Sequence, residues 1–245
     1  MITRIFVWIL DFLFPLSCLG CKKSGVLICD MCLDGIHGLE SQECPVCRKL
    51  NSFGEKCASC SGSLDGLIVA SRYDKNGLLK KLIEAFKYKY SRELSDSLAA
   101  ILLTKTHLLF NFFDQNSNGS DEYSAEIILV PVPLHKKRFN ERGYNQSQVL
   151  CENLAKIHRL KLYKAPILVR KINTPPQAKL KKNERLLNVK NAFECIDTSM
   201  IAGKNIVLVD DVCTTSATLN ECAIELKKNG ASKVCGLVLA RGDFH

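Results

Sequence analysis

Two adjacent carboxylates and a run of hydroxyls follow an apolar stretch near the carboxyl end of the chain. Residues 206–209 are apolar, Asp210 and Asp211 come next, and the hydroxyl-rich run then comprises Thr214, Thr215, Ser216, Ala217 and Thr218. Carboxylates can accept hydrogen bonds from sugar hydroxyls or hold a hydrated Mg²⁺, while hydroxyls and the N–H groups of a helix N-terminus can bind a phosphate. The pattern predicts a buried strand that ends at the carboxylates, a binding loop and a helix, which together hold a phosphorylated sugar.

Other folds also place acidic residues after a hydrophobic strand. Receiver and phosphatase folds do so, and Ser and Thr are common helix caps. Those folds usually carry the acidic strand near the start of the domain, and they do not follow it with four hydroxyls in five residues, as found here. Order and composition therefore favour the ligand site. The combination resembles the phosphoribosyl pyrophosphate (PRPP) motif of type I phosphoribosyltransferases.

Eight of the thirteen cysteines form four Cys-x-x-Cys pairs in the first quarter of the chain: Cys18/Cys21, Cys29/Cys32, Cys44/Cys47 and Cys57/Cys60. Two thiolates at this spacing supply two corners of a zinc tetrahedron, so four pairs predict two structural zinc sites with four cysteine ligands each. A disulfide framework is the alternative, but five further cysteines downstream and the lack of a convincing export signal favour a reducing compartment. The favoured pairing is sequential, with the first four cysteines on one ion, and the spacing leaves an interleaved pairing open.

The N-terminal apolar stretch has only part of the signature of a signal peptide. One arginine precedes it, Asp11 interrupts it, and no small-residue cleavage site comes before Cys18. It is also too short to span a bilayer. We expect an amphipathic helix over residues 4–13 that packs on the cysteine-rich module or on a partner, with membrane contact as a minor alternative. The expected protein is cytoplasmic and has no stable membrane insertion.

The remaining elements must position these groups. With 245 residues, 47% hydrophobic and 24% charged, the chain is long enough for one α/β domain and a smaller attachment. We predict a boundary that divides it into residues 1–63 and 64–245. Apolar periodicity predicts a strand over residues 67–73, a helix after Asn76-Gly77 and a second helix over about 92–113. The polar segment 114–124 is expected to be a surface loop.

A second strand is predicted over residues 127–135, ending in a proline-stiffened loop before a basic cluster. A helix should follow, reaching to about Ile157. Between residues 131 and 190 the chain carries fifteen Lys and Arg against three Glu, whereas its total charge is +9, so the basicity is local. Such a stretch can neutralise pyrophosphate, or it can follow a nucleic-acid backbone while Phe139 and Tyr144 stack on bases.

Three stretches now identify a family. The segment VPVPLHKKRFNERGYNQSQVLCENLA (130–155) resembles the signature of the ComF family, and residues 170–193 and 230–241 are similar to it as well. With the cysteine pairs, the likeness covers nearly the whole chain. It implies an N-terminal double zinc ribbon joined to a type I phosphoribosyltransferase-like domain, an α/β fold with a mainly parallel sheet and flanking helices.

The resemblance also implies roles for individual residues. Asp210 and Asp211 match the acidic pair that contacts ribose hydroxyls and Mg²⁺, and residues 214–218 match the 5′-phosphate loop. Arg142 and Gln146 lie in a stretch that faces pyrophosphate or the acceptor pocket. Residues 172–188 correspond to a mobile lid, with Lys179 and Arg185 as its candidate ligands. Ser216 departs from the glycine usual in the phosphate loop, so its hydroxyl either adds a phosphate contact or lowers the affinity for PRPP.

The function implied by the resemblance is the binding of PRPP with Mg²⁺, or of a related phosphoribosyl ligand, in a protein that handles internalised single-stranded DNA during natural transformation. Its expected partners are single-stranded DNA and competence helicase and recombination proteins. The alternative is an active phosphoribosyltransferase of the amidophosphoribosyl or purine type in nucleotide metabolism. No residue identifies an acceptor, so the sequence leaves the question of enzymatic turnover open.

Overall fold

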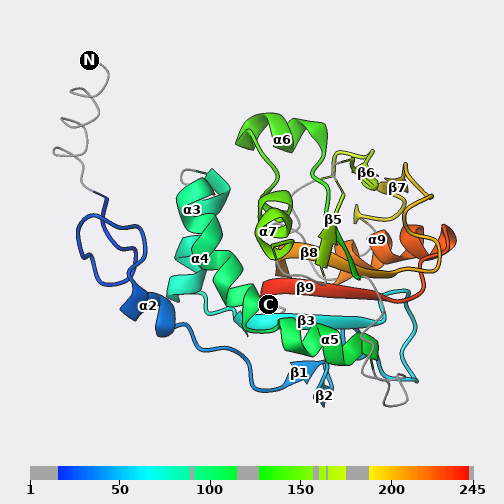
Figure 1. Ribbon diagram of the computed structural model, residues 1–245, viewed down its shortest axis with the longest axis horizontal. Helices are drawn as coiled ribbons and strands as arrows, with labels where there is room; N and C mark the ends of the chain where they lie inside the picture. Colours follow the sequence, from blue (N-terminus) through cyan, green and yellow to red (C-terminus); the bar gives the residue numbers. More distant parts are fainter. Residues whose placement is uncertain are drawn as a thin grey trace.

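The computed structural model describes residues 16–88, 91–114, 127–156, 160–163, 165–174 and 188–242. A five-stranded sheet lies at its centre (Figure 1), and its strands are β3 (Gly66–Arg72), β4 (Ile127–Pro131), β5 (Leu160–Leu162), β8 (Asn205–Cys213) and β9 (Val234–Arg241). The strands run in the order β3-β9-β8-β4-β5, and every neighbouring pair is parallel. This confirms the predicted mainly parallel sheet. The N-terminal helix expected over residues 4–13 lies outside the described residues.

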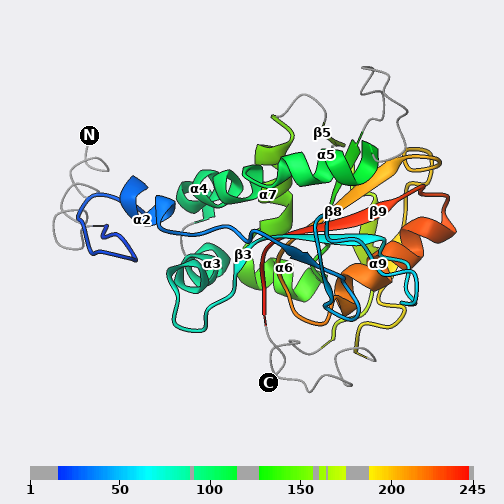
Figure 2. The same cartoon turned by 90° about the horizontal axis from the view of Figure 1, so that it is seen from below.

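Side chains alternate between the two faces of the sheet, as a buried parallel strand requires. On β8, Val207 and Val209 face one apolar core, and Ile206 and Leu208 face the other. Helices cover both faces, and Figure 2 shows α4, α5 and α7 on one side of the sheet and α9 on the other. The first core contains side chains of α3 (Leu78–Tyr88), α4 (Ser91–Leu103), α5 (Thr106–Asp114) and α7 (Gln146–Leu154). The second contains those of α9 (Ala217–Lys228) and of the antiparallel pair β6 (Leu168–Arg170) and β7 (Phe193–Cys195).

The strand order reverses between β4 and β8. From β4 the chain passes through α7 to β5 on one side, and from β8 it passes through α9 to β9 on the other. In parallel α/β sheets, ligands usually bind at the carboxyl ends of the strands at such a switch point, because crossovers in opposite directions place their helices on opposite faces. Asp210 and Asp211 lie near the carboxyl end of β8, at this switch point.

The cysteine-rich module packs against the open edge of the sheet. It contains α2 (Asp30–Asp34), β1 (Gln42–Glu43) and β2 (Leu50–Asn51), with α2 at one end of the molecule and the β1-β2 pair below β3 (Figure 1). The buried side chain of Gln42 accepts from the backbone N–H of Val69 at 2.8 Å and donates to its carbonyl at 3.2 Å. The carbonyl of Gly54 accepts from the N–H of Leu67 at 2.8 Å. These contacts cover the backbone of an edge strand that would otherwise be free to pair with another chain.

Three predicted boundaries differ from the structure. The helix expected over residues 92–113 is two helices, α4 and α5, because the Thr104 hydroxyl donates to the Ile101 carbonyl at 2.7 Å and Lys105 reaches the Leu39 carbonyl at 2.6 Å. Strand β8 continues past the carboxylates to Cys213, because its last residues still pair with β9. The strand expected over residues 127–135 ends at Pro131, and the basic cluster that follows forms the short helix α6 (Lys136–Arg142), capped by the His135 side chain and ended by Gly143 at φ +78°.

No helix among the described residues has both the length and the apolarity that crossing a bilayer requires.

Candidate functional site

Asp210, near the carboxyl end of β8, accepts two hydrogen bonds on one carboxylate oxygen. The hydroxyl of Ser147 donates to Asp210 Oδ1 at 3.1 Å, and the backbone N–H of Asp211 donates to the same oxygen at 2.9 Å. Ser147 lies at the start of α7, whose N-cap Asn145 accepts from the N–H of Ser147 at 3.1 Å and donates to the Val132 carbonyl beyond β4 at 3.0 Å. The start of α7 is thereby fixed both to the end of β4 and to the Asp210 carboxylate of β8.

Burial and charge both act on this carboxylate pair. Burial, and then the negative charge of Asp211, raise the pKa of Asp210 to about 7, although the N–H of Asp211, the charge of Lys87 and the Ser147 hydroxyl act in the opposite direction. Like-charged carboxylates disfavour each other's ionised form, and a cation between them relieves this. The donor set fits Mg²⁺, which is usually held by one or two carboxylates together with the phosphates of its substrate.

Lys87 is a site residue that the sequence reasoning missed. Its Nζ lies 3.1 Å from Asp211 Oδ1. Burial lowers the pKa of Lys87, but the neighbouring Asp211 and Asp210 outweigh this and raise it overall. A signal was present in the sequence, because Leu79 and Ile83 precede Lys87 at intervals of four, which puts a lysine on the apolar face of its helix.

The two residues predicted to face pyrophosphate or the acceptor pocket, Arg142 and Gln146, are joined to this lysine. Arg142 Nη1 donates to Gln146 Oε1 at 2.9 Å, and Gln146 Nε2 donates to the backbone carbonyl of Lys87 at 3.4 Å. Gln146 is buried. Arg142 at the end of α6 and Gln146 at the start of α7 therefore lie beside Lys87, while the other two candidates, Lys179 and Arg185, lie outside the described residues.

Two further arginines converge beside the site. Arg138 of α6 donates to the Thr174 carbonyl at 3.0 Å, and Arg170 of β6 donates to the Thr174 hydroxyl. Burial, followed by the charge of Arg138, lowers the pKa of Arg170. Two guanidinium groups that disfavour each other's charge form an environment in which an anion is stabilised. Thr174 directly precedes the segment 175–187, most of the predicted lid, which lies outside the described residues.

Thr214, Thr215 and Ser216 form the turn between β8 and α9, and Ala217 and Thr218 begin the helix, which is the predicted order of strand, loop and helix. Ser216 is the N-cap of α9 and has φ +59° and ψ +6°, the left-handed conformation that glycine adopts readily. Its hydroxyl donates to the carbonyl of Pro45 at 3.0 Å, so this hydroxyl is directed to the cysteine-rich module. Thr215 remains within the loop, where its hydroxyl accepts from the N–H of Ala217 at 3.3 Å.

The eight paired cysteines form two groups of four: Cys18, Cys21, Cys29 and Cys32, and Cys44, Cys47, Cys57 and Cys60. Within each group the sulfur atoms all lie within 4.8 Å of one another. The sequential pairing is therefore the one that the structure brings together. Three Sγ–Sγ distances are 3.8 Å for Cys18 and Cys29, 3.6 Å for Cys21 and Cys29, and 3.6 Å for Cys47 and Cys57. Zn–S bonds of about 2.3 Å give a tetrahedron edge of about 3.8 Å, so each group could hold a zinc ion.

The first Cys-x-x-Cys pair of each group forms the same turn. The N–H of Cys18 donates to the Lys23 carbonyl at 2.8 Å, and the N–H of Cys44 donates to the Lys49 carbonyl at 2.9 Å. The residues after the second cysteines, Lys22 and Arg48, have φ of +68° and +64°. Burial raises the pKa of Cys18 and Cys44, but backbone N–H groups outweigh it and lower the pKa to about 6 in both. A thiolate is the form that binds zinc.

Comparison with known proteins assigns the family. Competence protein ComFC of Bacillus subtilis strain 168 is 30% identical to the chain over an alignment of 226 residues, which covers 87% of this chain and 84% of that protein. The chain belongs to the ComF family. Competence protein F of Haemophilus influenzae is 26% identical to this ComF-family protein over 232 residues, covering 87% and 96% of the two chains. DNA utilization protein YhgH of Escherichia coli K12 is 30% identical over 156 residues, 64% of each chain. No family model matches.

Two solved structures similar to the ComF-family protein are distant. One is the allosteric regulatory enzyme of purine biosynthesis, 14% identical with a TM-score of 0.32, which covers 60% of this chain and 26% of that one. The other is hypoxanthine phosphoribosyltransferase from Trypanosoma cruzi, 12% identical with a TM-score of 0.31, covering 58% and 63%. The five-stranded parallel sheet, its flanking helices and the two four-cysteine groups before it agree with the predicted phosphoribosyltransferase-like class.

Proposed function

We propose that this ComF-family protein binds PRPP, or a related phosphoribosyl ligand, together with Mg²⁺ at the carboxyl ends of β4 and β8. The observation that carries the proposal is the hydrogen bond of 3.1 Å from Ser147 to Asp210, because it joins the start of α7 to a carboxylate of β8 at the switch point of the sheet. The hydroxyl-rich turn follows directly on β8. A sugar hydroxyl and a phosphate of one ligand can therefore be bound by consecutive parts of one segment.

Each group has a role that follows from its chemistry. Oxygens of Asp210 and Asp211 accept from the ribose hydroxyls and hold Mg²⁺, which supplies the positive charge that brings carboxylates and a pyrophosphate together. Thr214, Thr215 and Thr218, with the N–H groups at the start of α9, bind the 5′-phosphate. The positive charges of Arg138, Arg142 and Arg170 face the pyrophosphate, and the segment with Lys179 and Arg185 closes over it.

The biological setting comes from the relatives. They are named competence proteins or a DNA utilization protein, which supports a role of this chain in competence and DNA uptake. We propose that it handles internalised single-stranded DNA in the cytoplasm with helicase and recombination proteins. In this proposal residues 1–63 form a double zinc ribbon with two structural Zn²⁺ ions, and residues 64–245 form the ligand-binding domain.

Calorimetric titration of the full, zinc-loaded chain with PRPP and Mg²⁺ tests the ligand. The double variant Asp210→Asn/Asp211→Asn should lose Mg²⁺-dependent binding while its zinc content stays that of the wild type. Asp96→Asn is the matched control, because Asp96 is an exposed carboxylate with a long 4.0 Å contact to Lys156. Unchanged heat from the double variant would contradict the proposal. Incubation with labelled PRPP, with and without single-stranded DNA, then shows whether the protein turns PRPP over. Released pyrophosphate would identify an active phosphoribosyltransferase.

A further inference from the structure

The hydroxyl-rich turn between β8 and α9 is hydrogen-bonded to the segment that carries the second cysteine group. The bond is made by Ser216, which stands where the phosphate loop usually has glycine. The Ser216 hydroxyl is buried and donates to the carbonyl of Pro45, the residue after Cys44, at 3.0 Å. A serine in the left-handed region is strained relative to glycine and persists when its surroundings hold it there. The bond to Pro45 is one such restraint.

Arg241 supplies a second attachment. It is 7% exposed, and its Nη1 donates to Glu43 Oε2 and to the Cys44 carbonyl, both at 3.1 Å. Its Nη2 donates to the Pro45 carbonyl at 2.8 Å and to Ser216 Oγ at 3.4 Å. One buried guanidinium therefore contacts both the backbone of the cysteine turn and the side chain of the phosphate loop. Hydrogen bonds from a charged donor are stronger than neutral ones.

Arg48 supplies a third attachment from the metal-binding turn itself. It directly follows Cys47, in the left-handed conformation that closes this turn, and its backbone N–H donates to the Cys44 carbonyl at 3.1 Å. Its Nη2 donates to the carbonyls of Thr214 at 3.1 Å and Gly242 at 2.7 Å. The direction of the Arg48 side chain therefore depends on the fold of the turn that Cys44 and Cys47 define.

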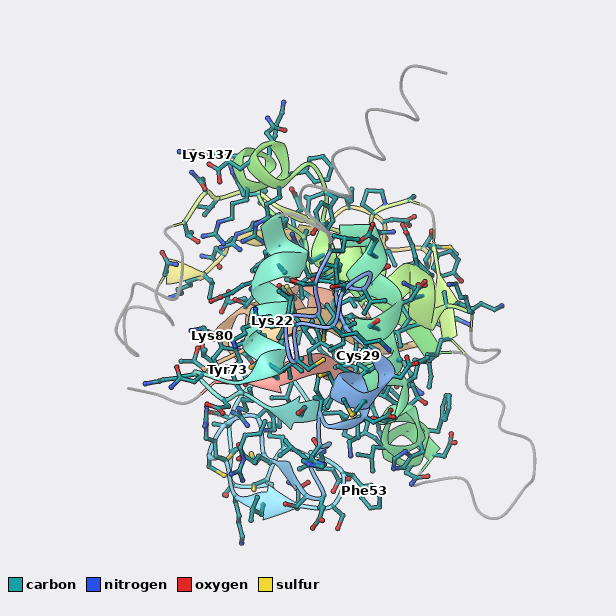
Figure 3. All side chains as sticks on the ribbon, turned by 90° about the vertical axis from the view of Figure 1, so that its left-hand side faces the viewer. Lys22, Cys29, Phe53, Tyr73, Lys80 and Lys137 are labelled. Carbon is teal, nitrogen blue, oxygen red and sulfur yellow. The ribbon has the colours of Figure 1, made fainter. Side chains whose placement is uncertain are left out.

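The first cysteine group lies elsewhere. Gly20, between Cys18 and Cys21, packs beside Leu78 at the start of α3, where an added Cβ would lie 3.1 Å from the leucine Cδ2. Figure 3 shows Cys29 beside α2, well separated from Phe53, which lies between Cys47 and Cys57 in the chain. The two groups have the same ligands and the same turn but different neighbours, so each serves as the control for the other.

We propose that metal binding at the second group, Cys44, Cys47, Cys57 and Cys60, holds the phosphate loop in its ligand-binding conformation through Arg48, Pro45 and Arg241, whereas the first group has no such effect. Arg48, Arg241 and Ser216 are positioning residues in this role. The inference rests on the proposed function where it concerns PRPP. Its consequence is that loss of zinc from one group alone, by oxidation or chelation, weakens phosphate binding at a site that contains no cysteine ligand.

The test compares Cys47→Ser with Cys21→Ser in the full chain. Both cysteines are exposed and hold the same place in their turns. Each variant should retain one zinc per chain. PRPP affinity should fall by roughly tenfold or more in Cys47→Ser, the equivalent of losing one or two buried hydrogen bonds, and should stay within about twofold in Cys21→Ser. Equal losses in the two variants, or full affinity in a Cys47→Ser protein that has lost its zinc, would overturn the proposal.

A second measurement needs no ligand. Amide hydrogen exchange over residues 213–218 should speed up in Cys47→Ser and stay as in the wild type in Cys21→Ser. Ser216→Ala, which keeps every cysteine, should retain two zinc ions and speed up exchange in the same segment. If the wild-type protein binds no PRPP, the proposed function fails. The exchange data then still test whether metal binding at the second cysteine group holds the loop over residues 213–218. Unchanged exchange in both Cys47→Ser and Ser216→Ala would refute it.

Discussion

Lys87 and Asp211 form an ion pair within the candidate site, with 3.1 Å between Nζ and Oδ1 and side-chain exposures of 22% and 10%. The pair joins α3 to the end of β8, two elements that are not neighbours in the chain. Lys87 also offers its backbone carbonyl to Gln146 at 3.4 Å. This one residue therefore connects the acidic pair to Gln146 and, through it, to Arg142 at the end of α6.

Replacement of Lys87 by glutamine should destabilise the protein, because Asp211 is then left buried beside Asp210 without a cation. We expect the free energy of unfolding at pH 8 to fall by about 1–3 kcal/mol in urea titrations. Lys80→Gln is the control in the same helix, since Lys80 forms a 3.8 Å contact with the exposed Glu84. It should change stability by less than about 0.5 kcal/mol. Equal losses in both variants would show that the buried Lys87–Asp211 pair contributes no more to the free energy of unfolding than the exposed Lys80–Glu84 pair.

Asp210 should make the stability of the protein depend on pH when no Mg²⁺ is added. The pKa of Asp210 is raised from 3.8 to about 7, so the folded protein keeps this proton at pH values where the unfolded chain has lost it. The resulting stabilisation is largest below about pH 4 and is lost as the pH rises to about 7. Asp210→Asn cannot ionise, so its stability relative to the wild type should increase between pH 5 and pH 8. Urea titrations across this range measure the difference.

The exposed Asp96 gives the control for this pH effect. The stability of Asp96→Asn relative to the wild type should stay nearly constant over the same range, because Asp96 is exposed and its 4.0 Å contact with Lys156 is weak. A difference between Asp210→Asn and the wild type that does not vary with pH would contradict a raised pKa at Asp210.

Zinc should be present at two equivalents per chain, since four sulfur atoms lie within 4.8 Å of one another in each of two groups. Elemental analysis of the purified protein measures this. A chelator that removes both ions should lower the unfolding temperature by roughly 10 °C, because a ligand bound only to the folded state adds its binding free energy to stability. Cys195→Ser should keep two zinc ions, because Cys195 belongs to neither group. Fewer than two equivalents in the wild type, with cysteine pairs oxidised, would favour disulfides.

Much of the fold and of the site is encoded locally and could be predicted. The Cys-x-x-Cys pairs, the apolar strand before Asp210 and the hydroxyls after it are each read from a few neighbouring residues. The structure brings the cysteine pairs together in two groups, and it has the expected strand, turn and helix in order around the hydroxyls. The sequential grouping of the cysteines follows because the pairs that share an ion are also near each other in the chain.

The contacts that could not be predicted depend on how distant elements dock. Ser216 and Pro45 are 171 residues apart, and Arg241 and Pro45 are 196 apart, so no spacing rule connects them. Ser216 could be recognised as a departure from glycine, but its bond to the cysteine module could not. Tyr144, which the sequence offered for base stacking, packs edge-on against Phe86 with ring centroids 6.0 Å apart, because helix α3 covers it.

Helix α6 should carry part of any affinity for single-stranded DNA. Lys136 and Lys137 are exposed, and Phe139 is 47% exposed on the same short helix, as a surface that follows a phosphate backbone and stacks on a base requires. Figure 3 shows Lys137 at one extreme of the molecule, away from Lys80 on α3. The slope of log affinity against log salt is negative, and each phosphate contact contributes about −0.7 to it. In the double variant Lys136→Gln/Lys137→Gln, the slope should therefore become shallower by about 1.4.

The matched control is the double variant Lys80→Gln/Lys81→Gln, which removes two adjacent lysines of α3. It should leave the salt slope within error of the wild type. Phe139→Ala should weaken binding by about 1–3 kcal/mol at every salt concentration, because stacking does not release counterions, and so should leave the slope unchanged. Fluorescence anisotropy with a labelled oligothymidylate at several salt concentrations measures all three variants. Equal changes of slope in the two lysine variants would mean that the chain's overall charge, and not α6, determines the interaction.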